Sequence, residues 1–196
     1  AMLCVNAIRD HGVLPADGKV IVTGATGGVG SVTTMLLAKL GYEVVAATGK
    51  AESRDYLISL GASDTIERAE LDRDAKPLEK ETWAAAVDSV GSKTLATVLA
   101  QTKYEGVVAA CGLAGGFDLP TTVMPYILRG VTLRGIDSVM ASREKRNRAW
   151  ADLADLINQE QLKEVYRIEA MSDIRGLADQ LMAGQITGRI VIDVNK

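Results

Sequence analysis

A glycine-rich segment at residues 23–30 (TGATGGVG) is the part of this 196-residue chain whose residue types and spacing most directly suggest chemistry. Small residues let a backbone turn tightly beside a pyrophosphate, and the free N–H groups of a following helix attract anions. Against the pattern G-x-G-x-x-G, Ala25 stands at the first glycine position, and Gly27 and Gly30 stand at the second and third. An apolar run precedes the segment and helical spacing follows it, so we expect a dinucleotide site. The alternative is a tight strand-to-helix turn that binds no nucleotide.

The end of the next expected strand indicates which dinucleotide this site takes. An NAD site carries Asp or Glu there, about 20 residues beyond the loop, to bind the ribose 2′-hydroxyl. Residues 47–50 instead read ATGK, so Thr48 and Lys50 offer a hydroxyl and a cation that suit a 2′-phosphate. Arg54, one helical turn further, could add a second cation, whereas Glu52 could bind a ribose hydroxyl. The missing acid favours NADP(H) over NAD(H).

Two further loops follow expected strands and would lie at the same ligand-binding edge of a parallel sheet. Residues 89–91 (SVG) and 111–114 (CGLA) are small enough to let a flat nicotinamide lie against backbone. Ordinary turn chemistry is the alternative for both. The sequence places no histidine or basic residue beside Cys111, so we expect a small, partly buried thiol there rather than a nucleophile.

The sequence lacks the residues that two other kinds of catalytic site require. A Tyr and a Lys four residues apart would indicate a short-chain dehydrogenase, but none of the five tyrosines has a lysine at that spacing. One histidine, His11, and two distant cysteines, Cys4 and Cys111, cannot assemble a four-ligand zinc site from soft ligands. We therefore expect no metal site, and we expect His11 to serve packing or a turn.

Composition argues against several classes of partner. The 22 Lys and Arg residues nearly balance 25 Asp and Glu residues, and aromatic residues make up 4%. Nucleic-acid binders usually show a basic excess or aromatic stacking platforms, so neither nucleic acid nor an anionic membrane is an expected partner. No apolar run reaches the roughly 20 residues that span a bilayer. Two thiols without a disulfide framework favour a reducing cytoplasm.

Strand and helix patterns alternate along the chain and predict how these loops are positioned. Apolar runs without a polar face predict buried parallel strands, and apolar residues at helical spacing predict helices between them. The expected strands are 19–23, 44–47, 64–66, 84–87, 106–111, 131–136, 165–168 and 189–194. The expected helices are 32–40, 52–60, 93–101, 142–159 and 173–183, with a polar surface loop at 67–82. This order predicts an α/β fold, a Rossmann-type doubly wound parallel sheet with helices on both faces.

Local signals also mark several helix ends. Gly41, Gly61 and Gly184 are expected to end helices, and Ser172 is expected to cap the last one. The basic residues within 143–148 are most simply a solvated helix face.

Six stretches of the chain resemble one known family. They are VTGATGGVGS at 22–31, LGAS at 60–63, VLAQ at 98–101, AACGLAGG at 109–116, LPTTVMP at 119–125 and GIDSVM at 135–140. With them the chain resembles the cofactor domain of a zinc-free medium-chain dehydrogenase/reductase of the quinone oxidoreductase and acryloyl-CoA reductase group. The likeness spans almost the whole chain, and the last three stretches are specific to the subgroup.

The resemblance implies a metal-free, NADPH-dependent oxidoreductase that reduces the C=C bond of an α,β-unsaturated carbonyl, either an acryloyl-CoA-like thioester or a quinone. Hydride would pass to the β-carbon while hydrogen bonds hold the carbonyl oxygen. The implied cofactor contacts are Thr26, Gly27, Gly28 and Val29 on the phosphate loop, Thr48 and Lys50 at the 2′-phosphate, and Cys111, Gly112, Leu113 and Ala114 on the nicotinamide side. Ser89 and Arg189 are weaker transfers, and no catalytic residue is carried over.

The likeness begins at the family's interdomain helix, so the family's N-terminal GroES-like, barrel-shaped catalytic domain is not matched. We expect residues 1–18 to be the rest of that helix and a lead-in, and 19–160 to be the NADP-binding Rossmann domain. Residues 161–196 would then be a strand-helix-strand that returns toward the missing domain. The competing function is a non-catalytic dinucleotide-binding module. Likeness to relatives also predicts a homodimer through an edge strand at 132–137.

Overall fold

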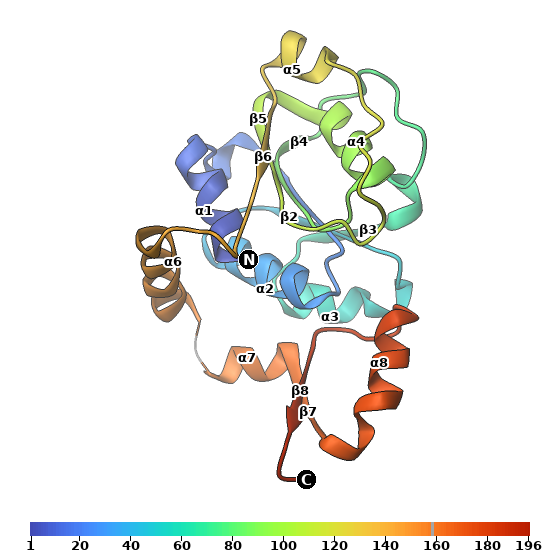
Figure 1. The fold of residues 1–196 in the computed structure, drawn as a ribbon. Helices are drawn as coiled ribbons and strands as arrows, with labels where there is room; N and C mark the ends of the chain where they lie inside the picture. The colour runs from blue at the N-terminus through green and yellow to red at the C-terminus, as the bar shows by residue number, and fades with distance from the viewer. Residues whose placement is uncertain (158) are drawn as a thin grey trace.

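Six parallel strands form one sheet in the computed structural model, which describes residues 1–157 and 159–196 (Figure 1). Their order across the sheet is β3-β2-β1-β4-β5-β6, and every neighbouring pair is parallel. The strands are β1 (Val20–Thr23), β2 (Val44–Thr48), β3 (Asp64–Glu67), β4 (Trp83–Asp88), β5 (Thr102–Ala110) and β6 (Thr132–Gly135). This is the strand order of a doubly wound Rossmann sheet, so the predicted fold class is confirmed.

Helices cover both faces of the sheet. They are α1 (Met2–His11), α2 (Gly28–Lys39), α3 (Arg54–Ser59), α4 (Ser92–Gln101), α5 (Met124–Arg129) and α6 (Arg143–Leu156). α1 and α2 pack on one face, α6 packs against α1, and α4 packs on the opposite face. Alternation along β1 requires both covers: Val20 and Val22 join the core under α1 and α2, and Ile21 joins the core under α4. All three side chains are fully buried, as expected in a parallel sheet.

A smaller unit follows the main sheet at the carboxyl end of the chain. α7 (Gln159–Val165) leads into β7 (Tyr166–Ala170), α8 (Ile174–Met182) and β8 (Arg189–Asp193). β7 and β8 pair in parallel as a separate two-stranded sheet, which lies beyond α2 and α3 in Figure 1. The Gly188 amide donates a 2.7 Å hydrogen bond to the Thr26 carbonyl, so this unit is fastened to the glycine-rich loop.

Several predicted boundaries are wrong. The helix expected at 142–159 is shorter than predicted, because α6 ends at Leu156 and its C-cap Ile157 adopts an extended backbone. Residue 158, inside the expected range, lies outside the described residues. The strand expected from 106 begins at Thr102, and Glu105 within it adopts a φ of +55° beside an irregular register with β4. The six residues of α5 were not expected, because a helix that short with Pro125 in its first turn shows no periodicity.

Residues 67–82 lie mostly on the surface, as their polarity predicts, but the segment also contacts the core. A short 3-10 helix (Arg68–Glu70) brings Leu71 into the core under α4, where its exposed fraction is 1%. Further on, the Glu79 carboxylate accepts hydrogen bonds from Arg73 Nη1 at 2.7 Å and from Gln101 Nε2 at 3.0 Å. The segment is therefore attached to the end of α4 by one apolar anchor and one charged anchor.

The helix-end signals are mostly confirmed. Gly41, Gly61 and Gly184 all adopt positive φ directly beyond helix ends, where a left-handed residue stops the helix. Ser172 does not cap α8: the N-cap residue is Asp173, and the Ser172 hydroxyl bonds the Asp173 carboxylate at 3.2 Å. His11 ends α1, and its Nε2 lies 3.0 Å from the Glu105 carbonyl oxygen.

Candidate dinucleotide-binding site

The loop between β1 and α2 is so tightly built that only glycine fits at two of its positions. Gly24 adopts a φ of +59°, and a side chain there would meet Ser89 Oγ at 2.5 Å. At Gly30, a Cβ would lie 2.3 Å from the Gly24 carbonyl oxygen, so the first turn of α2 presses on the loop. Gly27 is the N-cap of α2, and the free N–H groups and positive end of the helix begin there. This geometry suits a bound phosphate.

Arg189, the first residue of β8, lies over the first turn of α2. A Cβ at Gly28 would come within 2.8 Å of the guanidinium, which therefore rests directly on the phosphate loop. Val29 and Arg189 line the same apolar cavity of about 390 Å³ between α2 and α8. A guanidinium here adds positive charge to a helix N-terminus, and a pyrophosphate would accept hydrogen bonds from both. Arg189, one of the two weaker transfers, thus lies beside the loop between β1 and α2.

The end of β2 lies beside the phosphate loop. Thr48 Oγ1 is 3.4 Å from Thr26 Oγ1, and the Lys50 amide donates a 3.1 Å hydrogen bond to Thr48 Oγ1. The Lys50 ammonium donates to the Ile186 carbonyl at 2.6 Å, and burial lowers the pKa of Lys50. The loop before β8 therefore holds the Lys50 side chain at the tip of β2, where the Lys50 backbone also bonds the Thr48 hydroxyl.

A second cation at this strand tip comes from a residue that the sequence did not single out. Arg54 points elsewhere, because its Nη1 donates to Thr65 Oγ1 at 2.7 Å and to Asp64 Oδ1 at 3.1 Å. Arg68, just beyond β3, instead covers the strand tip: a Cβ at Gly49 would lie 3.1 Å from its Cζ. Its only sequence signal is its place directly after the neighbouring parallel strand.

The ends of β1 and β4 are joined by a buried polar network. Thr23 Oγ1 donates a 2.7 Å hydrogen bond to Asp88 Oδ1, and the Gly91 amide donates to Asp88 Oδ2 at 2.8 Å. A further hydrogen bond links the two strand ends, since Ser89 Oγ donates to the Thr23 carbonyl at 3.0 Å. Asp88 is fully buried, and burial raises the pKa of its carboxyl. Ser89 thus fixes the end of β1, where the glycine-rich loop begins. Asp88 is a positioning residue that the sequence analysis missed, although it is the one acid of the buried strand β4.

Backbone hydrogen bonds join the loop after β5 to the end of β4 and to the loop that follows it. Cys111 N donates to the Asp88 carbonyl at 2.8 Å, and Ala114 N donates to the Ser89 carbonyl at 3.3 Å. Gly112 packs so closely that a Cβ would lie 2.7 Å from the Ser89 carbonyl oxygen. Leu113 points outward, with 64% of its surface exposed. The backbone of this loop therefore lies directly against the loop after β4, at the carboxyl edge of the sheet.

Cys111 has a partner that spacing alone could not predict. Cys4, in the first turns of α1, is buried in the core cluster against which the partly buried Cys111 packs. A hydrogen bond from the Cys4 thiol lowers the pKa of Cys111. The same contact, together with burial, raises the pKa of Cys4. The two cysteines of the chain thus form one thiol pair, with Cys111 as the more acidic member.

The eleven predicted cofactor contacts fall on four loops at one edge of the sheet, at the carboxyl ends of β1, β2, β4 and β5. They are Thr26, Gly27, Gly28, Val29, Thr48, Lys50, Ser89, Cys111, Gly112, Leu113 and Ala114. β1 and β4 are neighbours at the point where the strand order reverses. Ligands of open α/β sheets bind in the crevice at such a switch point.

The described residues offer neither a cluster of metal ligands nor a membrane-spanning helix. Within residues 1–157 and 159–196, no three His, Cys, Asp or Glu side chains gather closely enough to hold a metal ion. No helix of this described part is long and apolar enough to cross a membrane.

Known proteins share this arrangement of loops and strands. A family model described as zinc-binding dehydrogenase matches residues 28–159, from the first turn of α2 through α6. The chain belongs to the zinc-binding dehydrogenase family. Among curated members of the family, acrylyl-CoA reductase AcuI of Ruegeria pomeroyi is 53% identical over 196 residues, which are 100% of this chain and 59% of the relative. Putative quinone oxidoreductase YhfP of Bacillus subtilis is 42% identical over 194 residues, which are 98% of this chain and 59% of the relative.

Solved structures within the family agree closely with this one. Escherichia coli YhdH, crystallised with bound NADPH, is 50% identical with a TM-score of 0.96, over 99% of this chain and 60% of that one. The Salmonella enterica yhdH oxidoreductase, in complex with NADP, is 49% identical with a TM-score of 0.95, over 98% and 59%. The predicted likeness to the quinone oxidoreductase and acryloyl-CoA reductase group is confirmed. The chain spans about 60% of the length of these relatives.

Proposed function

We propose that this chain binds NADP(H) across the carboxyl edge of its sheet. The pyrophosphate lies on Gly27, Gly28 and the start of α2, with Arg189 above it. The 2′-phosphate of the adenosine ribose lies between Lys50 and Arg68. The nicotinamide lies along the backbone at 111–114, over the switch point between β1 and β4.

One observation carries this proposal: the strand tip beside the phosphate loop offers cations where an NAD site offers a carboxylate. Lys50 is held there by the Ile186 carbonyl, and Arg68 covers Gly49. Two cations and the Thr48 hydroxyl match the charge and the acceptor oxygens of a 2′-phosphate. Relatives crystallised with NADPH or NADP support the same cofactor, whereas YhfP of Bacillus subtilis was crystallised with NAD.

The activity proposed for the whole protein is reduction of the C=C bond of an α,β-unsaturated thioester or quinone. NADPH, when bound, supplies the hydride that reaches the β-carbon of the substrate. This chain contributes the cofactor side: it fixes the nicotinamide against rigid backbone and positions the face that donates hydride. The proposed division is 1–18 as lead-in, 19–160 as cofactor domain and 161–196 as a return toward a GroES-like domain that supplies the rest of the substrate pocket. The names of the relatives AcuI and YhfP support the proposed activity.

A combined experiment tests the proposal. NADPH binding is measured by calorimetry on this chain alone, and reduction of acryloyl-CoA and of a quinone is measured after joining it to the N-terminal domain of the Escherichia coli relative. We expect binding in the first case and NADPH oxidation in the second. Binding without turnover would favour the second candidate, a non-catalytic dinucleotide module, whereas no binding would refute both.

A homodimer through β6 belongs to the same proposal. β6 is an edge strand that pairs only with β5 within the described sheet, so its outer hydrogen-bonding groups are open to a partner strand. Ile127 and Leu128, on the helix just before β6, are exposed by 73% and 55%. Two copies related by a two-fold axis would cover both features. We further propose a cytoplasmic enzyme that has neither nucleic acid nor membrane as a partner.

A further inference from the structure

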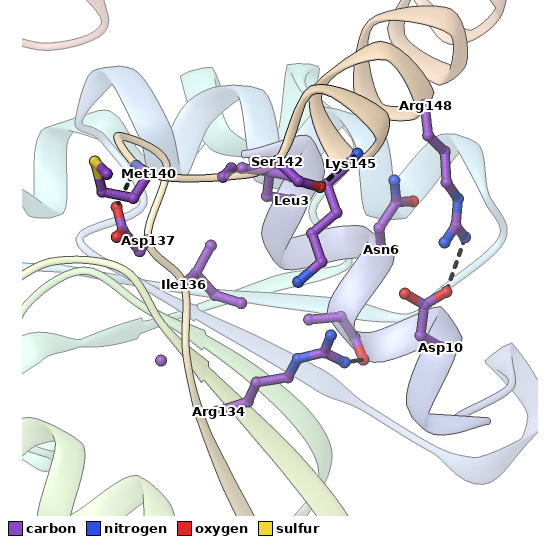
Figure 2. Close-up of a pocket in the computed structure, with 13 residues that line it drawn as sticks. Leu3, Asn6, Asp10, Arg134, Ile136, Asp137, Met140, Ser142, Lys145 and Arg148 are labelled. Carbon is purple, nitrogen blue, oxygen red and sulfur yellow. Dashed lines mark hydrogen bonds and ion pairs between the residues drawn. The ribbon is translucent and has the colours of Figure 1, made fainter.

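A second cavity lies at the opposite end of the sheet from Lys50. It occupies about 370 Å³ between α1, the carboxyl end of β6, the turn at 136–142 and the start of α6 (Figure 2). The Ile136 amide, in its wall, donates a 2.8 Å hydrogen bond to the Ala110 carbonyl, and Ala110 immediately precedes Cys111. The cavity is therefore one strand away from the expected nicotinamide position, along the same carboxyl edge. We refer to it as the basic pocket.

Positive charge dominates the basic pocket. Arg134, Lys145 and Arg148 line it together with Asp10 and Asp137. Both acids already have partners. Asp10 forms a 2.8 Å ion pair with Arg148. Asp137 Oδ1 accepts hydrogen bonds from two backbone amides of the following turn, at 2.8 Å and 3.1 Å. Arg134 and Lys145 therefore remain as cations without a carboxylate partner among the ion pairs of residues 1–157 and 159–196.

These two cations converge on the same space. In Figure 2 the Lys145 ammonium and the Arg134 guanidinium both extend into the gap between α1 and the strand segment that carries Ile136. The arginine is oriented by a 3.5 Å contact from its Nη1 to the Ala7 carbonyl. Two like charges directed into one cavity repel each other, and an anion between them would relieve that repulsion. The pair therefore favours a ligand with negative charge.

A helix terminus adds to this preference. α6 has 14 residues, and its N-cap Ser142, which lines the pocket, accepts a 3.3 Å hydrogen bond from the Lys145 amide. The positive end of the helix macrodipole therefore faces the cavity from the same side as the Lys145 side chain. Phosphate groups bind readily where Lys, Arg and a helix N-terminus meet.

The rim of the basic pocket is apolar. Leu3 and Ile136 line it, and Met140 on its turn is exposed by 81%. A ligand that reaches from the nicotinamide to the cations would cross these side chains before its charged end arrives at Arg134 and Lys145. A coenzyme-A thioester has that layout, because a long, weakly polar arm separates its reactive acyl group from its phosphates.

We propose that the basic pocket binds the phosphate groups of a coenzyme-A thioester substrate, with Arg134 and Lys145 as the binding cations. This inference rests on the proposed function, since it places the substrate of that reaction. It assigns recognition of the coenzyme to the cofactor-binding chain and distinguishes thioester substrates from quinones, which carry no phosphate.

Calorimetric titrations of this chain test the assignment. The ligands are coenzyme A, 3′-dephospho-coenzyme A, pantetheine and inorganic phosphate, each added with NADP⁺ at saturation so that the dinucleotide site is closed to the adenosine group. The variants are Lys145→Ala and Arg134→Gln, and Arg143→Ala on the same helix is the control of equal charge outside the pocket. We expect coenzyme A to bind, pantetheine not to bind, and each pocket variant to weaken binding by about tenfold or more while the control does not.

Several results would overturn the assignment. They are no binding of coenzyme A in the presence of saturating NADP⁺, equal binding by the two pocket variants and the control, and pantetheine binding as tightly as coenzyme A. Inorganic phosphate that binds as tightly as coenzyme A would mean an adventitious ion only. NADPH titrations of the wild type separate the two proposals. If the wild type binds NADPH but not coenzyme A, this inference alone is refuted. If the wild type does not bind NADPH, the proposed function is refuted.

Discussion

Asp88 Oδ1 accepts a 2.7 Å hydrogen bond from Thr23 Oγ1, and these two residues end the neighbouring strands at which the strand order of the sheet reverses. The same carboxylate accepts from the Gly91 amide, and Ser89 Oγ donates to the Thr23 carbonyl. The phosphate loop and the loop after β4 are therefore fixed to each other before any cofactor is bound. Such preorganisation lets cofactor binding proceed without first ordering either loop.

Removing one donor from this buried pair tests its contribution to stability. Thr23→Val keeps the shape of the side chain but leaves the buried Asp88 carboxylate with one donor fewer. We expect the free energy of unfolding to fall by about 1–3 kcal/mol, measured by urea denaturation. The matched control is Thr34→Val, because Thr34 Oγ1 is buried with no hydrogen-bond partner among the described residues. Its replacement should leave stability unchanged or raise it; equal losses in both variants would contradict the role of Asp88.

The charged anchor at Glu79 predicts a specific pH dependence. Hydrogen bonds from Arg73 above all, and then from Gln101, hold the pKa of the Glu79 carboxyl at about 2. A lowered carboxyl pKa contributes stability above the ordinary value, and that contribution is lost as the pH falls toward about 2. Glu79→Gln should therefore be less stable than the wild type at pH 7, and the difference should shrink steadily below pH 4.5.

Urea titrations across this pH range, run beside Glu43→Gln, check the prediction. Glu43 pairs with Lys19 at 3.4 Å on the surface, with half of its side chain exposed, so its neutralisation should change stability by less than about 1 kcal/mol. A difference between wild type and Glu79→Gln that stays constant with pH would show that the carboxylate charge is not what stabilises the segment 67–82.

Two neighbouring glycines of α2 should respond differently to the same added methyl group. In Gly30→Ala the new Cβ would lie 2.3 Å from the Gly24 carbonyl oxygen and 2.6 Å from Ala25 Cα, and this backbone cannot move without opening the loop. In Gly28→Ala the Cβ meets only the flexible end of Arg189. We expect Gly30→Ala to lose about 1–3 kcal/mol of stability and Gly28→Ala to lose little. Thermal unfolding measures both, and a Gly28→Ala loss as large as that of Gly30→Ala would be inconsistent with this packing.

Cys111 should be the reactive thiol of the chain. Its pKa is lowered by the Cys4 thiol, and the thiolate is the form that reacts with iodoacetamide. The pH–rate profile of alkylation at Cys111 should therefore shift to higher pH in Cys4→Ala, which lacks the donor. Peptide mass spectrometry assigns the site, and Cys4 itself should stay unlabelled in the folded wild type. An unshifted profile in Cys4→Ala would show that the thiol contact does not set the reactivity, and bound NADPH should slow labelling if the nicotinamide lies where we propose.

Much of the fold followed from the sequence because its signals are local. Each of these signals depends only on one short segment of sequence. They are the apolar strands without a polar face, the glycine-rich turn after β1 and the left-handed glycines after helices. The doubly wound sheet then followed from the alternation of strands and helices. The short α5 escaped detection because six residues cannot display a helical period.

The contacts that complete the candidate site could not be predicted, because they join segments far apart in the chain. Arg68 covers Gly49 only because β3 lies beside β2, whereas Arg54, closer in sequence, is drawn to Asp64 by charge. The partnership of Cys4 with Cys111 likewise depends on α1 packing over the end of β5. Knowing the strand order would have pointed to Arg68, and knowing where α1 packs would have pointed to Cys4.

The most direct test of the account compares the affinities of this chain for NADPH and NADH by calorimetry, in the wild type, Lys50→Ala and Arg54→Ala. The 2′-phosphate is the difference between the two ligands, and Lys50 is the residue held beside it. We predict that the wild type prefers NADPH, that Lys50→Ala weakens NADPH binding by about tenfold or more while leaving NADH binding unchanged, and that Arg54→Ala changes neither. Equal wild-type affinities for the two dinucleotides, or an equal loss of both in Lys50→Ala, would contradict the account.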